Sequence, residues 1–272
     1  MKKLLGLILI AIIVLAGSPA MAGKQTTLEI KAMLGAAYNA DTGLMNDSLR
    51  VAGLLPVKEP YTGMGYHFTT GLPAQAGEQA VADESVFAVE GENAIVDWVV
   101  VEIRARRSGT PVIYSRSALI QADGDIVDVD GVSNITVPIS GFDHYIALRH
   151  RNHLAVMTAR PLNLKNGYDF TTMPVYGKEG VKVVSDVQTL WPGNANFDGN
   201  VSYMGAKNDN EAVGAVVGME NPNNVVSGYF GADTNMDGIV KYTGTMNDRD
   251  FILVNLNGSP TFVRFEQMPK VK

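Results

Sequence analysis

The chain has 272 residues, of which 28 are acidic and 22 are basic, and it contains no cysteine. A net negative charge provides no basic surface for nucleic acid or for an anionic membrane, so we expect neither as a partner. The absence of cysteine excludes disulfides, thiolate metal sites and a lipid-modified cysteine.

Residues 1–22 have the pattern of a secretory signal peptide. Lys2 and Lys3 precede an apolar run from Leu4 to Ala16, and Ala20-Met21-Ala22 fits the small-residue rule for cleavage. The run is short for a membrane span, and no second run follows it. We therefore expect cleavage after Ala22, a secreted, extracellular or cell-surface location, and no membrane span after cleavage. A retained anchor is the alternative.

Residues 23–180 are predicted to form a mainly β domain, an N-terminal β-sandwich of the Ig or prealbumin type. Thr27–Leu34 alternates polar and apolar residues, as a half-buried strand does, whereas Ala94–Ala105 is apolar through its centre and is expected in the middle of a sheet. Many short strands separated by turns favour a sandwich. The remaining expected strands are Val112–Tyr114, Ala118–Gln121, Ile126–Val129, Ile135–Val137, Tyr145–Arg149, Leu154–Thr158 and Tyr168–Phe170.

Some residues of this β region are weaker candidates for a site. Asp97 and Glu102 could act as a catalytic pair, but the favoured interpretation places both in solvent on one side of the sheet. His150 and His153 could share a metal ion only if a turn separates them, because residues three apart on a strand face opposite sides. Polar residues at a strand end or hairpin are favoured there. Trp98 and the tyrosines could form a sugar-stacking platform, although core packing is favoured.

The C-terminal region, residues 181–272, contains an internal repeat. The segment Asp233–Val240 repeats the pattern of Asn194–Val201 at a spacing of 39 residues (233 − 194). The likeness continues through the pairs Tyr203/Tyr242, Gly205/Gly244 and Asn208/Asn247. A repeat at a fixed spacing indicates a duplicated structural unit.

The residue types of each copy are those of a calcium loop. Such a loop needs side-chain oxygens at its first, third and fifth positions, a glycine at the sixth and a carbonyl at the seventh. The same residue types also favour turns that bind no ion, but two copies in register favour calcium. The expected ligands are Asn194, Asn196, Asp198 and the carbonyl of Asn200 in the first loop, and Asp233, Asn235, Asp237 and the carbonyl of Ile239 in the second.

The acid that closes each loop is displaced, because the twelfth position holds Gly205 or Gly244. We expect Glu211 and Asp250 to supply the closing oxygens. Asp209 and Asp248 are the alternatives, as ligands or as helix caps. The two loops are thus predicted to bind two calcium ions. The second site is expected to be the tighter one, since Asp233 replaces Asn194 and adds an anionic ligand.

A helix is predicted after each loop, from Glu211 to Val217 and from Asp250 to Leu256. Gly218 and Gly258 are the expected stops. Because apolar residues recur at helical spacing in both, the two helices are expected to bury their apolar faces on each other. Thr261–Phe265 is expected to form a final strand that docks on the body of the protein.

The paired loops, each followed by one helix, resemble dockerin type I modules of secreted bacterial proteins over Leu190–Gly258. The whole chain resembles secreted Bacteroidetes-type proteins that join a β-sandwich to dockerin-like repeats and are labelled haemagglutinin-like or hypothetical. The segments that carry this likeness are Leu54–Pro56, Glu59–Tyr61, Val96–Val99, Arg149–Leu154 and Val240–Gly244. The resemblance implies that the protein is secreted and that its repeats bind calcium. We expect the module either to bind a cohesin-like partner protein or to pack on the sandwich of its own chain.

No catalytic signature for a serine hydrolase, a zinc protease or a phosphate loop occurs in the sequence. We therefore expect a secreted or cell-surface protein that is not an enzyme, in which calcium serves structure or docking. An adhesin that binds carbohydrate is the alternative, and a component of polysaccharide breakdown is a weaker one.

Overall fold

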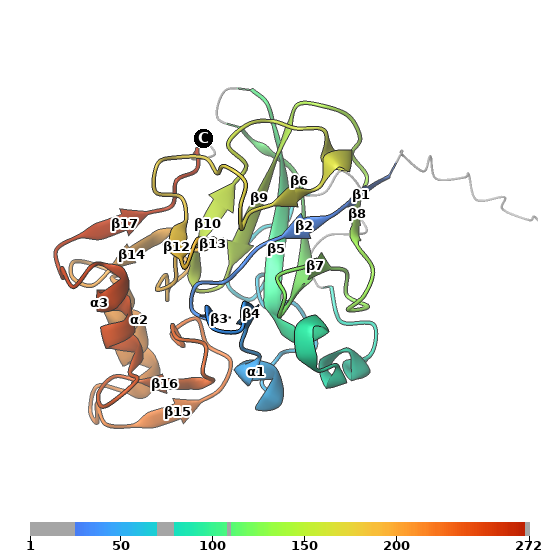
Figure 1. Ribbon diagram of the computed structural model, residues 1–272. Coiled ribbons are helices and arrows are strands. Elements are labelled where there is room, and N and C mark those ends of the chain that lie inside the picture. Colours follow the sequence, from blue (N-terminus) through green and yellow to red (C-terminus); the bar gives the residue numbers. More distant parts are fainter. Residues whose placement is uncertain (1–24, 70–78, 108–109, 270–272) are drawn as a thin grey trace, which may run out of the picture.

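The computed structural model describes residues 25–69, 79–107 and 110–269. The expected signal peptide and its cleavage site lie outside these ranges. The fold is mainly β, as the sequence predicts, with three short α-helices among the described residues. Figure 1 shows the β body and, on one flank of it, the C-terminal module that carries α2 and α3.

Within the described residues, the largest sheet has five antiparallel strands in the order β10-β9-β5-β6-β7. The expected central strand is β5 (Ile95–Ala105), which lies between β6 (Val112–Gln121) and β9 (His144–His150). β10 (His153–Met157) and β7 (Ile126–Val127) complete the sheet. Every residue of β5 except the last is buried. The strand is therefore covered on both faces, as a continuous apolar run predicts.

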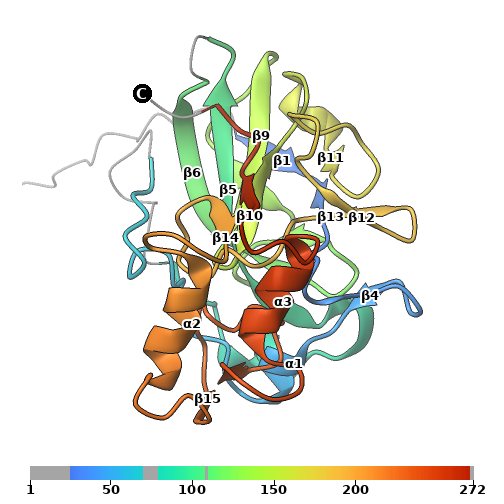
Figure 2. The ribbon, with the colours of Figure 1, turned by 90° about the vertical axis from the view of Figure 1, so that its left-hand side faces the viewer.

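Two-stranded ladders surround this sheet. The views in Figures 1 and 2 agree that the N-terminal strands cross one face of it. The pairs in the body are β1 (Thr26–Leu28) with β8 (Ile135–Val137), β2 (Ile30–Lys31) in parallel with β11 (Tyr168–Asp169), β3 (Tyr38–Asn39) with β4 (Leu44–Met45), and β12 (Lys182–Val184) with β13 (Val187–Thr189). The short helices of the body are α1 (Ser48–Val51) and the 3-10 turns η1 (Glu84–Ala88), η2 (Gly91–Asn93) and η3 (Leu164–Asn166).

The C-terminal module contains α2 (Asp209–Val217) and α3 (Asp248–Asn255), which lie side by side in Figure 2. β14 (Asn200–Ser202) follows the first loop, and β16 (Ile239–Lys241) follows the second. β15 (Val225–Ser227) pairs with β16. Thr261–Phe265 was expected to form a strand that docks on the body. The strand forms as β17 (Val263–Phe265), but it pairs with β14 of the module and not with the body.

The module has its own apolar core, built from equivalent residues of the two repeats. Val213 and Ile252 are fully buried, and so are Val201 and Val240. Leu154 of β10 belongs to the same cluster. The expected packing of the two helices on each other is thus confirmed, and one residue of the large sheet takes part in it.

Candidate functional site

The two repeats agree in backbone conformation as well as in sequence. Residues at equivalent positions share a left-handed backbone conformation, which residues other than glycine rarely adopt. The pairs are Phe197 and Met236 (φ 61° and 59°), Lys207 and Met246 (φ 56° and 55°), and Gly199 and Gly238 (φ 83° and 84°). Both helices begin after an asparagine, Asn208 or Asn247, whose side chain accepts the N–H three residues on. The duplication is therefore a duplication of structure.

Side-chain oxygens of the expected ligands gather around one backbone N–H in each loop. The N–H of Asp237 donates to Oδ1 of Asp233 at 3.1 Å and to Oδ1 of Asn235 at 3.0 Å. In the first loop, the N–H of Asp198 donates to Oδ1 of Asn194 and of Asn196, both at 3.1 Å. The amide of the third residue also donates to Oδ2 of the fifth, at 3.4 Å in the first loop and 3.2 Å in the second. The first, third and fifth side chains of each loop thus lie close to one another, as a calcium loop requires.

The acids that face the loops are Asp209 and Asp248, the alternatives of the sequence analysis. Oδ2 of Asp209 accepts the N–H of Ser202 at 2.7 Å, and Oδ1 of Asp248 accepts the N–H of Thr234 at 2.7 Å. Both carboxylates are fully buried. Glu211 and Asp250 are exposed on the first turns of the helices instead. The geometry therefore favours Asp209 and Asp248 over Glu211 and Asp250 as the closing acids. In that assignment four residues, not six, are looped out, since Asp209 is the sixteenth residue counted from Asn194.

Burial and repulsion between neighbouring carboxylates raise the pKa values of three acids of the loops. Burial, with the charge of Asp198, raises the pKa of Asp209 to about 7. Burial raises the pKa of Asp233 to about 7 although Arg151 opposes the rise, and the charge of Asp248 adds to it. Burial and Asp237 likewise raise the pKa of Asp248 to about 6. Carboxylates whose pKa rises for these reasons gain most from a neighbouring cation.

The fourth residue of each loop points into the β body. Met236 is 1% exposed and belongs to the main core, while Phe197 packs against that core with its ring 5.8 Å from the ring of Tyr61. A Cβ added to Gly238 would lie 2.8 Å from Leu54 of the body. The loops are therefore seated on the sheet domain through apolar side chains, which favours the expected packing of the module on its own body.

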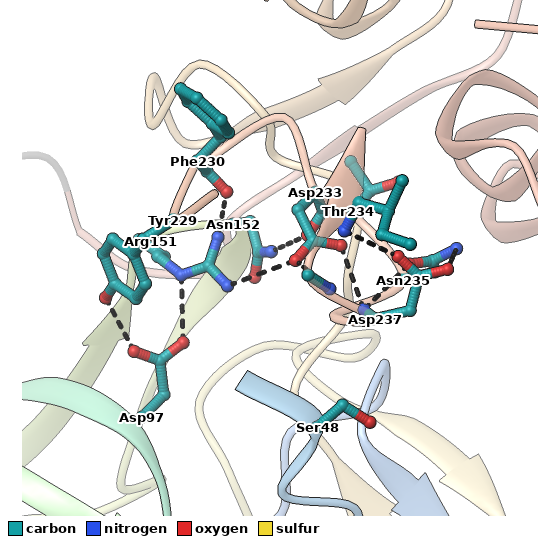
Figure 3. A network of polar contacts seen from close by, with 12 residues as sticks. Ser48, Asp97, Arg151, Asn152, Tyr229, Phe230, Asp233, Thr234, Asn235 and Asp237 are labelled. Carbon is teal, nitrogen blue, oxygen red and sulfur yellow. Dashed lines mark hydrogen bonds and ion pairs between the residues drawn. The ribbon is translucent and has the colours of Figure 1, made fainter. Parts of the chain in front are cut away.

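The tip of the β9–β10 hairpin, Arg151 and Asn152, contacts the beginnings of both loops, and Figure 3 shows its approach to the second. The carbonyl of Asn152 accepts the N–H groups of Gly193 and Asn194, at 2.9 Å and 3.0 Å, where the first loop begins. Its side-chain amide donates to the carbonyl of Asp233 at 2.6 Å, where the second loop begins. One residue thus holds the opening positions of both loops.

Arg151 is fully buried and joins three parts of the chain. Its Nε donates to Oδ2 of Asp97 on β5 at 2.9 Å, its Nη1 donates to the carbonyl of Phe230, and its Nη2 lies 4.0 Å from Oδ2 of Asp233. That Nη2 has no hydrogen-bond partner among the described residues. The guanidinium therefore connects the central strand to the segment that enters the second loop (Figure 3).

Asp97 is the centre of this junction, and its expected exposure was wrong. It is fully buried and accepts bonds from Arg151, from the hydroxyl of Tyr229 at 2.6 Å and from Nε2 of His150 at 3.1 Å. Burial alone raises its pKa, but Arg151 and His150 outweigh this and hold the pKa of Asp97 below its ordinary value. Its role in the structure is that of a buried counter-ion.

Glu102 is also buried, contrary to expectation, and lies apart from Asp97. It accepts Nε of Arg104 at 2.8 Å, Nε of Arg149 at 2.6 Å and the hydroxyl of Tyr66 at 2.8 Å. Arg149 continues to Glu266 at 3.1 Å, just beyond β17. Burial raises the pKa of Glu102, but the two arginines more than reverse this and lower it. With their hydrogen-bond capacity used in separate ion pairs, Asp97 and Glu102 do not form a catalytic pair.

His150 and His153 are brought together by the turn at Arg151 and Asn152, with their Nδ1 atoms 2.9 Å apart. Nε2 of His153 accepts the N–H of Ala36 at 3.1 Å, so its proton sits on Nδ1 and is directed at His150 and Oδ1 of Asn152. Nε2 of His150 then donates to Asp97. All four ring nitrogens are used, which favours the expected hairpin role over a metal pair. Burial lowers the pKa of both rings.

Trp98 is fully buried, and its Nε1 donates to the carbonyl of Pro56 at 2.9 Å. The favoured interpretation of core packing is thus confirmed for this residue, which cannot stack on a sugar in this conformation. Sequence reasoning did not find Arg151, Asn152 and Tyr229. The available signal was a run of five polar residues, residues 149–153, within an apolar region, which requires buried partners.

Within the described ranges, no helix has the length and apolar character needed to cross a membrane. The same ranges contain no group of three or more His, Asp or Glu side chains placed to share a metal ion. Each loop instead combines carboxylates with asparagine amides. No family model, no curated protein and no solved structure matches the chain.

Proposed function

We propose that the protein is an exported, non-enzymatic β protein whose two C-terminal loops each bind a calcium ion. In this proposal the β body is a sandwich and the module is a dockerin-like pair. The observation that carries it is the repeat, at one spacing, of a loop whose first, third and fifth side chains lie close together and which faces a buried acid, Asp209 or Asp248.

The donor set fits a hard cation such as calcium. Each loop offers only oxygen atoms, from Asn and Asp side chains and a backbone carbonyl, which are the ligands that hard cations prefer. The residues that would hold the first ion are Asn194, Asn196, Asp198, Asp209 and the carbonyl of Asn200. Those for the second are Asp233, Asn235, Asp237, Asp248 and the carbonyl of Ile239. The ion would neutralise carboxylates whose pKa is otherwise raised.

Calcium serves structure in this proposal. An ion that binds the folded loops and not the unfolded chain stabilises the fold by mass action. Since Met236 and Phe197 project from the loops onto the body core, ordering of the loops also orders these contacts. Without the ion, the repelling carboxylates of the module oppose its folding.

Isothermal titration of the full chain with calcium, after EDTA treatment and dialysis, tests the proposal. We expect two bound ions, and we expect circular dichroism to show less helix in EDTA than in calcium. Asp209→Asn should remove one ion, while the matched change Glu211→Gln, two residues away on the exposed side of the same helix, should keep both. The absence of binding at millimolar calcium contradicts the proposal, and loss of an ion in Glu211→Gln alone contradicts the assignment of the closing acid.

A further inference from the structure

Three segments meet at the tip of the β9–β10 hairpin. They are the tip itself, Arg151 and Asn152, the start of the first loop at Gly193–Ala195, and the start of the second loop at Phe230–Asp233. They approach closely: a Cβ added to Gly231 would lie 2.6 Å from the carbonyl oxygen of Ala195 and 3.7 Å from that of Arg151. The two loops are thus held against each other and against the tip.

We infer that Asn152 is the positioning residue shared by both calcium loops and that it couples the two ions. The inference rests on the calcium binding proposed above. Ordering of either loop fixes Asn152, because the main chain of this residue bonds to the first loop and its side chain bonds to the second. An ion in one loop therefore prepares the other, and calcium binding is cooperative.

The geometry assigns the coupling to Asn152 rather than to its neighbours. The side-chain bond from Nδ2 to the carbonyl of Asp233 is buried and short, at 2.6 Å, and Oδ1 of the same amide is engaged by Nδ1 of His153 at 2.7 Å. The amide cannot rotate without breaking both bonds. Asp97, through Arg151, holds the tip to β5 from the other side. The tip is thus a fixed point against which both loops are ordered.

A cycle of variants measures the coupling. Asp198→Ala removes the first ion site, Asp237→Ala removes the second, and each is made with and without Asn152→Ala; Asn134→Ala, an exposed asparagine of the body, is the matched control. In the parent background, loss of one site should weaken the other about fivefold or more, by the same factor in both directions. With Asn152→Ala this factor should fall towards one, and with Asn134→Ala it should not change.

The outcomes are distinct. If the parent chain binds two ions independently, or if Asn152→Ala weakens both sites and leaves the coupling factor intact, the inference is wrong and Asn152 has only a general structural role. If the parent chain binds no calcium, the proposed function itself fails.

A second measurement avoids any dependence on the folding of Asn152→Ala. In Asp198→Ala, calcium can occupy only the second loop. Its addition should nevertheless slow hydrogen exchange of the N–H groups of Gly193 and Asn194, which donate to Asn152. Unchanged exchange at both amides, with the second loop occupied, overturns the inference.

Discussion

Removal of the charge of Asp97 gives the sharpest test of the junction between the β body and the module. In Asp97→Asn the side chain keeps its size, but the guanidinium of Arg151 loses its partner at 2.9 Å while both groups stay fully buried. A buried charge left without its partner costs about 3–5 kcal/mol. Since the nearest other carboxylate of the junction, Asp233, lies 4.0 Å away, it compensates only in part.

The effect is measured as the free energy of unfolding in urea at saturating calcium, with circular dichroism as the signal. For a chain of this size the expected loss corresponds to a decrease of about 6–20 °C in Tm. Asp143→Asn is the matched control. It removes an arginine partner at a similar distance, 3.1 Å from Arg106, but both side chains are 62% exposed, so the expected loss is about 0–1 kcal/mol.

The double variant Asp97→Asn with Arg151→Met removes both charges of the pair and should recover part of the lost stability, because no uncompensated ion remains. A loss below about 1 kcal/mol for Asp97→Asn, or equal losses for Asp97→Asn and Asp143→Asn, refutes the argument that burial makes this ion pair critical.

The remaining predictions concern the loops and the histidine pair. Met236→Ala should lower the free energy of unfolding by about 2–5 kcal/mol and Met246→Ala by about 0.5 kcal/mol or less. The two methionines share a left-handed backbone conformation, but they are 1% and 71% exposed. Equal effects of the two changes in urea titrations would contradict the packing of the second loop in the body core. Asp233→Ala with Asp237→Ala should remove the higher-affinity step of a calcium titration, and loss of only the weaker step would show that Arg151 offsets the extra carboxylate of the second loop. At saturating calcium, stability should fall as the pH drops below about 6.5, because His150 and His153 have lowered pKa values and the unfolded chain then binds more protons than the folded one. A stability that stays flat from pH 7 to pH 5 in unfolding titrations would show that the pair is not held neutral.

Local patterns in the sequence were sufficient for the elements whose stability is local. The central strand β5 follows from a continuous apolar run, and α2 and α3 follow from the helical spacing of their apolar residues. Both helices begin two residues earlier than predicted, and their caps are Asn208 and Asn247 rather than Asp209 and Asp248. The two loops could be recognised because the repeat shows which residue types recur at the same positions of both copies.

Features that depend on distant contacts could not be predicted in this way. Asp97 was expected in solvent because an isolated carboxylate on a strand usually faces water, and its partner Arg151 lies 54 residues further along the chain. The bond from Asn152 to Asp233 spans 81 residues. The sequence also did not show which acid faces each loop, because this depends on which side of the helix is buried: Asp209 and Asp248 are buried against the loops.

The seating of the loops also bears on how the gene can be divided. A cut at the expected boundary between residues 180 and 181 would leave the body without Tyr229, which completes the hydrogen bonds of Asp97, and without Met236, which fills part of its interior. The separated tail would in turn lose Leu154 from its own interior. Neither half is a self-sufficient piece for recombination, so the two must be inherited and transplanted together.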